Sequence, residues 1–112
     1  MDLQIELLSA TVTKAIPVGR WDAVGASDID LRLSALSGSG RSLIIDMAQV
    51  SFLSSMGIRS IVMSAKAVTL RGGKLVLLSP NENIAMVLTN TGIDTLVPIL
   101  DDLDAALLAV EG

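Results

Sequence analysis

The sequence predicts a single α/β domain over residues 1–112, with a mixed sheet of about four to five strands and about four helices. Three observations support this prediction. Residues 2–18 alternate apolar and polar side chains, which is the period of half-buried strands. After residue 40, short apolar runs alternate with longer amphipathic stretches, which favours parallel strands joined by helices. A chain of 112 residues is long enough for one hydrophobic core but not for two.

The first third of the chain predicts two strands and a helix. Residues 3–7 and 12–18 both alternate, so we expect an antiparallel hairpin that turns near Ser9. Asp22 is a suitable N-cap for a helix over residues 23–36. The side chains expected to be buried on these three elements are, in order, Leu3, Ile5 and Leu7; Val12, Ile16 and Val18; and Ala26, Ile29, Leu33 and Leu36.

The middle of the chain predicts a covered strand and a second helix. Residues 42–46 form a continuous apolar run that ends at Asp46, which is typical of a strand buried on both faces. A short loop then leads to the adjacent pair Ser54 and Ser55. An amphipathic helical pattern follows over residues 55–70 and stops before two glycines.

The second helix is expected to bury one face and expose another. With Ile58 as the centre of the buried face, the helical period places Ile61, Val62, Ala65 and Thr69 beside it. The same period places a neighbouring stripe in solvent. The residues of this exposed stripe are Ser55, Arg59, Met63 and Lys66.

The last third predicts a strand over residues 74–78 and a helix over residues 82–89, introduced by Asn81. A short strand is expected near Leu96 and Val97. A final helix is expected over residues 101–110.

Composition excludes several classes of function. The chain has no histidine and no cysteine, so the commonest general base and the commonest metal ligands are missing. The net charge of −4, with one Phe and one Trp, argues against nucleic-acid binding. No apolar run approaches the roughly 20 residues of a membrane span, and the opening residues do not form a signal peptide. We therefore expect a cytoplasmic protein without membrane insertion, catalytic residues, metal or cofactor.

Three local patterns occur in an informative order. The first is Gly19-Arg20-Trp21-Asp22-Ala23, and the second is Val-Ser-Phe-Leu-Ser-Ser-Met-Gly-Ile over residues 50–58, preceded by Asp46. The third is Leu-Thr-Asn-Thr-Gly-Ile over residues 88–93. Together they resemble the STAS domain family of bacterial anti-sigma factor antagonists, and the resemblance covers nearly the whole chain.

The resemblance implies a STAS-like α/β sandwich with a site at the second motif. Aligned on Phe52 and Gly57, the family's phosphorylated serine falls on Ser55. The preceding residue is often Asp in the family and is Ser54 here, so Ser54 is the alternative acceptor. Asp22 lies in a turn that packs near the serine loop in the family.

The family's function implies partners rather than substrates. The unphosphorylated protein is expected to bind an anti-sigma factor serine kinase, and a protein phosphatase is expected to reset it. The residues that we expect to contact the partner are Asp22, Ser54, Ser55, Met56, Arg59 and Met63.

The side chains at this site have simpler uses as well. A serine at a helix start commonly caps the helix, and Ser54 is the more natural cap while Ser55 is the more natural acceptor. Arg59 lies four residues after Ser55. It either pairs with a phosphate on Ser55 or is an ordinary solvent-exposed side chain. Met56 and Met63 are adaptable contact residues, and Met56 lies nearer the core side.

Two other functions stay open. A constitutive STAS accessory subunit of a lipid-transport ATPase, or a signalling scaffold, would share the fold and bind its partner without a switch. A hydrolase with Ser54 or Ser55 as nucleophile lacks a histidine base, and Lys66 is about three turns away.

Overall fold

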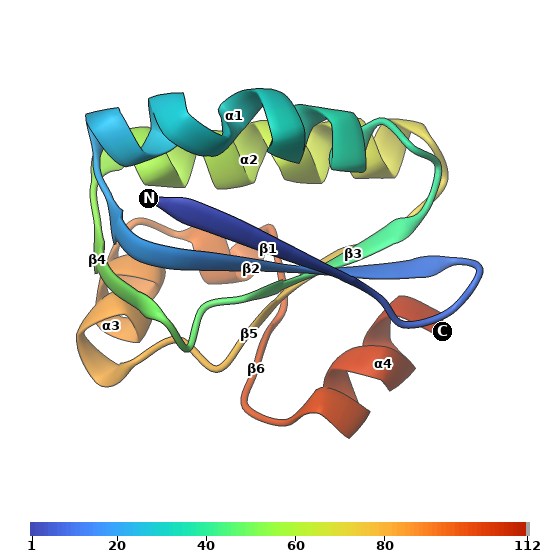
Figure 1. The fold of residues 1–112 in the computed structure, drawn as a ribbon. Coiled ribbons are helices and arrows are strands. Elements are labelled where there is room, and N and C mark those ends of the chain that lie inside the picture. Colours follow the sequence, from blue (N-terminus) through green and yellow to red (C-terminus); the bar gives the residue numbers. More distant parts are fainter. Residues whose placement is uncertain (112) are drawn as a thin grey trace.

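The computed structural model describes residues 1–111, which form six strands, four α-helices and one 3₁₀ turn (Figure 1). In chain order these are β1 (Asp2–Leu7), β2 (Val12–Trp21), α1 (Ala23–Ser37), β3 (Ser42–Asp46), β4 (Val50–Leu53), α2 (Ser55–Leu70), β5 (Leu75–Leu78), α3 (Glu82–Asn90), η1 (Ile93–Thr95), β6 (Ile99–Leu100) and α4 (Leu103–Glu111).

One mixed sheet organises the molecule. Its strand order is β1-β2-β3-β5-β6, with β1 antiparallel to β2 and the other pairs parallel. The strand β4 also pairs with β2, in parallel, beyond the point where β3 stops. Helices α1 and α2 lie side by side on one face of the sheet, and α4 covers the other face (Figure 1). The predicted α/β class and the N-terminal hairpin are confirmed.

The central strands are buried on both faces, as the apolar run at residues 42–46 predicts. Alternate residues of β3 point to opposite sides, so Ile45 packs in the cluster under α1 and α2 while Ile44 packs with α4. In β5, Leu77 packs in the cluster under α1 and α2, whereas Val76 packs with α4. The sheet therefore supports two apolar layers, and the larger one lies beneath the two helices that begin near the serine pair.

Two predictions about short strands are wrong. The expected loop before the serines contains β4, a four-residue strand that pairs with the end of β2. The strand expected near Leu96 and Val97 is absent, and the pairing falls on β6 at Ile99–Leu100 instead. Gly92 is in a left-handed conformation and starts the 3₁₀ turn η1, which delays the return of the chain to the sheet.

The predicted buried face of α2 is rotated from the observed one. Thr69 is exposed, and Ile58, Val62 and Ala65 are only partly buried. The helix packs against α1 as well as the sheet, so small side chains occupy much of the inner face: Ser60 donates a hydrogen bond to Asp30 of α1 (2.7 Å). The buried residues of α2 are Gly57, Ser60, Ile61, Ser64 and Val68.

The predicted faces of the hairpin are also only partly right. Leu3 is buried, but Ile5 and Leu7 are exposed because β1 is an edge strand. On β2 the alternation predicts one apolar face, yet both faces are covered. Val12 packs on the α4 side, with Ile16 and Val18 half-buried; the opposite face buries Thr13, Ala15 and Pro17.

The first turn of α2 sits directly on Trp21. This tryptophan is fully buried, and Gly57 faces it. A Cβ atom at position 57 would lie 2.6 Å from Leu53 Cδ1 and 2.9 Å from both Trp21 Cγ and the Trp21 carbonyl oxygen. Only glycine allows this approach without displacement of backbone.

We expect Gly57→Ala to lower the free energy of unfolding by about 1–3 kcal/mol, because the added methyl group overpacks a rigid contact. Urea denaturation followed by Trp21 fluorescence measures the change. The matched control is Gly38→Ala at the end of α1, where the nearest atom to a new Cβ is 3.5 Å away. Equal stability of Gly57→Ala and the wild type would contradict the packing described.

Candidate functional site

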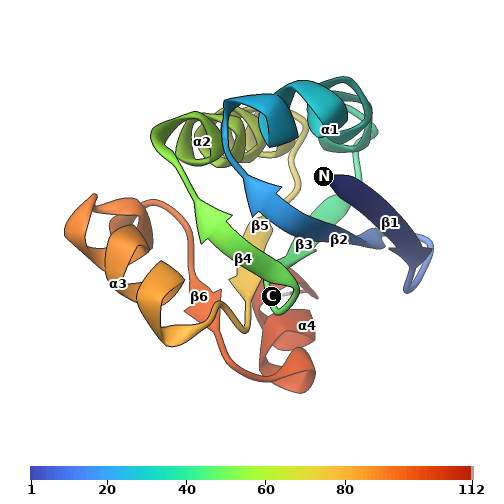
Figure 2. The same cartoon turned by 60° about the vertical axis from the view of Figure 1, so that its left-hand side comes forward.

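The starts of α1 and α2 lie next to each other because the strands that lead into them are paired. Trp21 is in register with Leu53 across β2 and β4. The Trp21 carbonyl oxygen accepts hydrogen bonds from the Ser54 backbone N–H (2.9 Å) and from Ser54 Oγ (3.0 Å). Figure 2 shows β2 and β4 running side by side into the two helices.

The Ser54 side chain stabilises the start of α2. Its Oγ atom also accepts a hydrogen bond from the Gly57 N–H (3.4 Å), so it is the N-cap, as predicted. The side chain is half-buried and takes part in two contacts. A modification of this hydroxyl would break both of them.

Ser55 is placed differently. It is the first residue of α2 and is exposed to solvent. Its hydroxyl makes no hydrogen bond within the described part of the chain. The first-turn amides of a helix lack intrahelical partners and carry the positive end of the helix dipole. The structure therefore presents a free hydroxyl where an added anion is tolerated.

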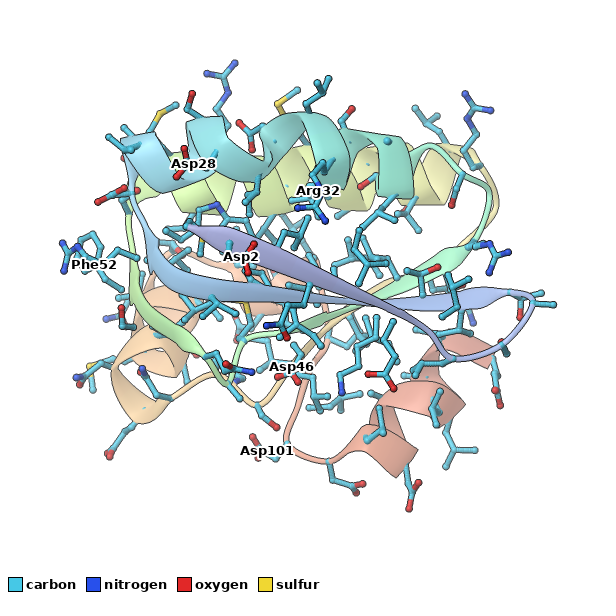
Figure 3. The ribbon with its side chains drawn as sticks, in the orientation of Figure 1. Asp2, Asp28, Arg32, Asp46, Phe52 and Asp101 are labelled. Carbon is cyan, nitrogen blue, oxygen red and sulfur yellow. The ribbon has the colours of Figure 1, made fainter. Side chains whose placement is uncertain are left out.

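Arg20 of β2 and Phe52 of β4 lie opposite each other on the two strands that lead into α1 and α2. The Arg20 guanidinium lies 4.3 Å from the centroid of the Phe52 ring, within the range of a cation–π contact. Arg20 Nε is also 3.6 Å from Asp22 Oδ2. Figure 3 shows Phe52 projecting from the edge of the molecule. Sequence reasoning missed the contact with Phe52 because it depends on the pairing of β4 with β2.

Asp22 is the N-cap of α1, as predicted. Its Oδ1 atom accepts a hydrogen bond from the Gly25 N–H (2.9 Å). That bond, and to a lesser extent the charge of Arg20, hold the pKa of the Asp22 carboxyl below its ordinary value of 3.8. Its place beside the serine turn agrees with the position that the resemblance implies.

Met56, Arg59 and Met63 line a groove of about 690 Å³ between α1 and α2. Met56 is 39% exposed and Met63 is 58% exposed, so Met56 is the less exposed of the two, as expected, although it does not pack in the core. Arg59 is exposed and forms no ion pair within residues 1–111. Ser55 does not line this groove.

The carboxylate of Asp46 makes contacts within the fold. Asp46 is 3.6 Å from Lys14 Nζ and accepts a hydrogen bond from the Ala48 N–H (3.0 Å). Among residues 1–111, no three His, Cys, Asp or Glu side chains are grouped so that they could hold a metal ion. None of the helices that the structure describes is long and apolar enough to cross a membrane.

The two serines should differ in their effect on stability. We expect Ser54→Ala to lower the free energy of unfolding by about 1–2 kcal/mol, because it removes a cap and a hydrogen bond. We expect Ser55→Ala to change it by less than about 0.5 kcal/mol. Urea denaturation compares the two variants, and equal losses would contradict the division of roles.

Asp22 should contribute stability that depends on pH. Its folded-state pKa is lowered, so the contribution is fully present above pH 3.8 and is lost as the pH falls through the folded-state pKa. We expect Asp22→Asn to melt at a lower temperature than the wild type at pH 7. The two melting temperatures should converge as the pH falls below 3.8 and through the lowered folded-state pKa. A difference that stays constant across this range would contradict the assignment.

The model of the STAS domain matches residues 17–106 of this chain. A curated relative from Thermotoga neapolitana, whose name describes a candidate anti-sigma factor antagonist homologous to TM1081, is 34% identical over 70 residues. The match spans 62% of this chain and 62% of that relative.

Solved structures share the fold. The crystal structure of TM1081 from Thermotoga maritima, also described as a candidate anti-sigma factor antagonist, has a TM-score of 0.88 at 22% identity, over 98% of this chain and 95% of that one. SpoIIAA of Bacillus in its phosphorylated form has a TM-score of 0.73 at 17% identity, over 96% of this chain and 99% of that one. With its sheet order, its paired helix starts and a family match over most of its length, the chain belongs to the STAS domain family.

Proposed function

We propose that this protein is a non-enzymatic binding module, an anti-sigma factor antagonist that is controlled by phosphorylation of Ser55. In this proposal the unphosphorylated protein binds an anti-sigma factor serine kinase, and the phosphorylated protein is released. The observation that carries the proposal is the contrast between the two serines: Ser54 is tied into the fold and Ser55 is free. The names of the relatives support the choice of partner.

Phosphorylation at this position would act on the partner more than on the fold. A phosphoserine adds a charge of about −1.5 to −2 and three strong acceptor oxygens. The N-terminus of α2 accommodates such an anion, so the domain stays folded. A partner surface packed against the neutral hydroxyl would have to desolvate the dianion. A loss of about 3 kcal/mol weakens binding more than a hundredfold.

The surface around Ser55 has exposed apolar side chains of the kinds found in protein–protein interfaces. Phe52, Met56 and Met63 are exposed apolar side chains on β4 and α2. Aromatic residues and methionine are enriched in protein interfaces. A phosphatase that resets the switch would find the phosphoryl group on the same open turn.

A binding assay with the host's serine-kinase anti-sigma factor tests the proposal. We expect wild type and Ser55→Ala to bind within a few-fold of each other, and Ser55→Asp to bind more than about a hundredfold more weakly. The matched control is Ser9→Asp, which adds the same charge in the exposed β1–β2 turn at the opposite end of the strand.

Mass spectrometry of the protein isolated from its host identifies the modified residue. Phosphate on Ser55 agrees with the proposal, whereas phosphate on Ser54 alone would reassign the acceptor. Equal binding by wild type, Ser55→Ala and Ser55→Asp would reject the switch and favour a constitutive contact.

A further inference from the structure

Arg20 lies near the end of β2, which pairs with β4 just before the chain reaches Ser55. Arg20 is in register with Phe52, and the next residue along, Trp21, accepts a hydrogen bond from the Ser54 N–H (2.9 Å). This hydrogen bond joins Trp21 to Ser54. Arg20 immediately precedes Trp21 in the sequence, and Ser55 immediately follows Ser54. Adjacent strands lie about 4.8 Å apart, so we expect the long side chain of Arg20 to reach the first residue of the helix that follows β4.

The pairing of strands beside this arginine is irregular. The pairing of β2 with β4 shifts register between Gly19 and Arg20, and Gly19 has a φ of +113°, a conformation that favours glycine. The extra residue of this irregularity is Ser51, on β4. The Arg20 side chain is 64% exposed and is stacked on Phe52. Stacking uses the face of the guanidinium and leaves the N–H donors at its edge available.

The present anionic partner of Arg20 holds it weakly. The distance from Arg20 Nε to Asp22 Oδ2 is 3.6 Å, longer than the 2.7–2.9 Å or so of a charge-assisted hydrogen bond. The other carboxylate oxygen of Asp22 is bound to the first turn of α1 through the Gly25 N–H. A dianionic phosphate with three acceptor oxygens is a stronger partner for a guanidinium than this carboxylate.

We propose that Arg20 is the residue that pairs with the phosphoryl group on Ser55, exchanging its contact with Asp22 for the phosphate while it stays stacked on Phe52. This inference rests on the proposed modification of Ser55. It assigns the pairing to the neighbouring strand and not to Arg59, the residue one helical turn later that the helical spacing suggests. Arg59 lines the groove between α1 and α2, which also contains Asp30.

The second ionisation of the phosphate reports the pairing. A nearby cation favours the dianion and lowers its pKa, which is about 6 for phosphoserine. The experiment uses the full chain with phosphoserine installed at position 55 during synthesis, and follows the phosphorus-31 NMR shift against pH. We expect Arg20→Gln to raise this pKa by about 0.5, a modest shift because the site is exposed.

Two variants control the measurement. Arg20→Lys keeps the positive charge and should retain most of the lowered pKa. Arg59→Gln removes the same charge from α2 and should leave the pKa unchanged within error. Circular dichroism of each variant confirms that it is folded before the titration. The Arg20 effect should shrink as salt is added, because exposed charges are screened.

If the phosphate pKa in Arg20→Gln equals that of the wild type, the inference is overturned. If the phosphate pKa is raised only in Arg59→Gln, the pairing belongs to Arg59 instead. The titration needs no kinase, since the phosphate is built into the chain. Absence of phosphate on Ser55 in the host would therefore count against the proposed function while the titration still decides the role of Arg20.

Discussion

The carbonyl oxygen of Trp21 is the group on which the site depends. It accepts both the backbone N–H and the hydroxyl of Ser54, so it fixes the start of α2 against the end of β2. The close approach of Gly57 to the same tryptophan completes the contact. The residue that follows Ser54 in this turn, Ser55, is exposed to solvent. One arrangement of backbone thus determines which serine supports the fold and which is free.

This arrangement explains how a modification can act without unfolding the protein. The core lies beneath α1 and α2 and around β3 and β5, whereas Ser55 stands on the open turn above it. A phosphoryl group there would lie at a helix N-terminus and, in our proposal, would pair with an exposed arginine; both favour an anion. In the proposed function, the energetic cost would fall on a partner protein that is docked over Phe52, Met56 and Met63. A switch of this kind needs no second conformation of the domain.

Most of the helices and strands could be predicted from the sequence, because their apolar periodicities are strong and local. The helix over residues 55–70 and the strand over residues 42–46 were predictable with their ends, since caps and apolar runs mark them. The strand β4 was not, because its four residues show no clear alternation and depend on tertiary contacts, above all the pairing with β2. The same pairing brings Arg20 to Phe52, so this part of the site was hidden for the same reason. The inner face of α2 was misjudged because small residues that face α1 carry no hydropathy signal.

The central claim is that a phosphoryl group on Ser55 changes the surface and leaves the fold intact. Comparison of ¹H–¹⁵N NMR spectra of the chain with serine and with phosphoserine at position 55 tests it most directly. We predict shifted amide signals confined to the first turn of α2 and to residues 20–22 and 52–54 beside it. Shifts spread through β3, β5 and α4, or loss of the dispersed spectrum, would contradict the account.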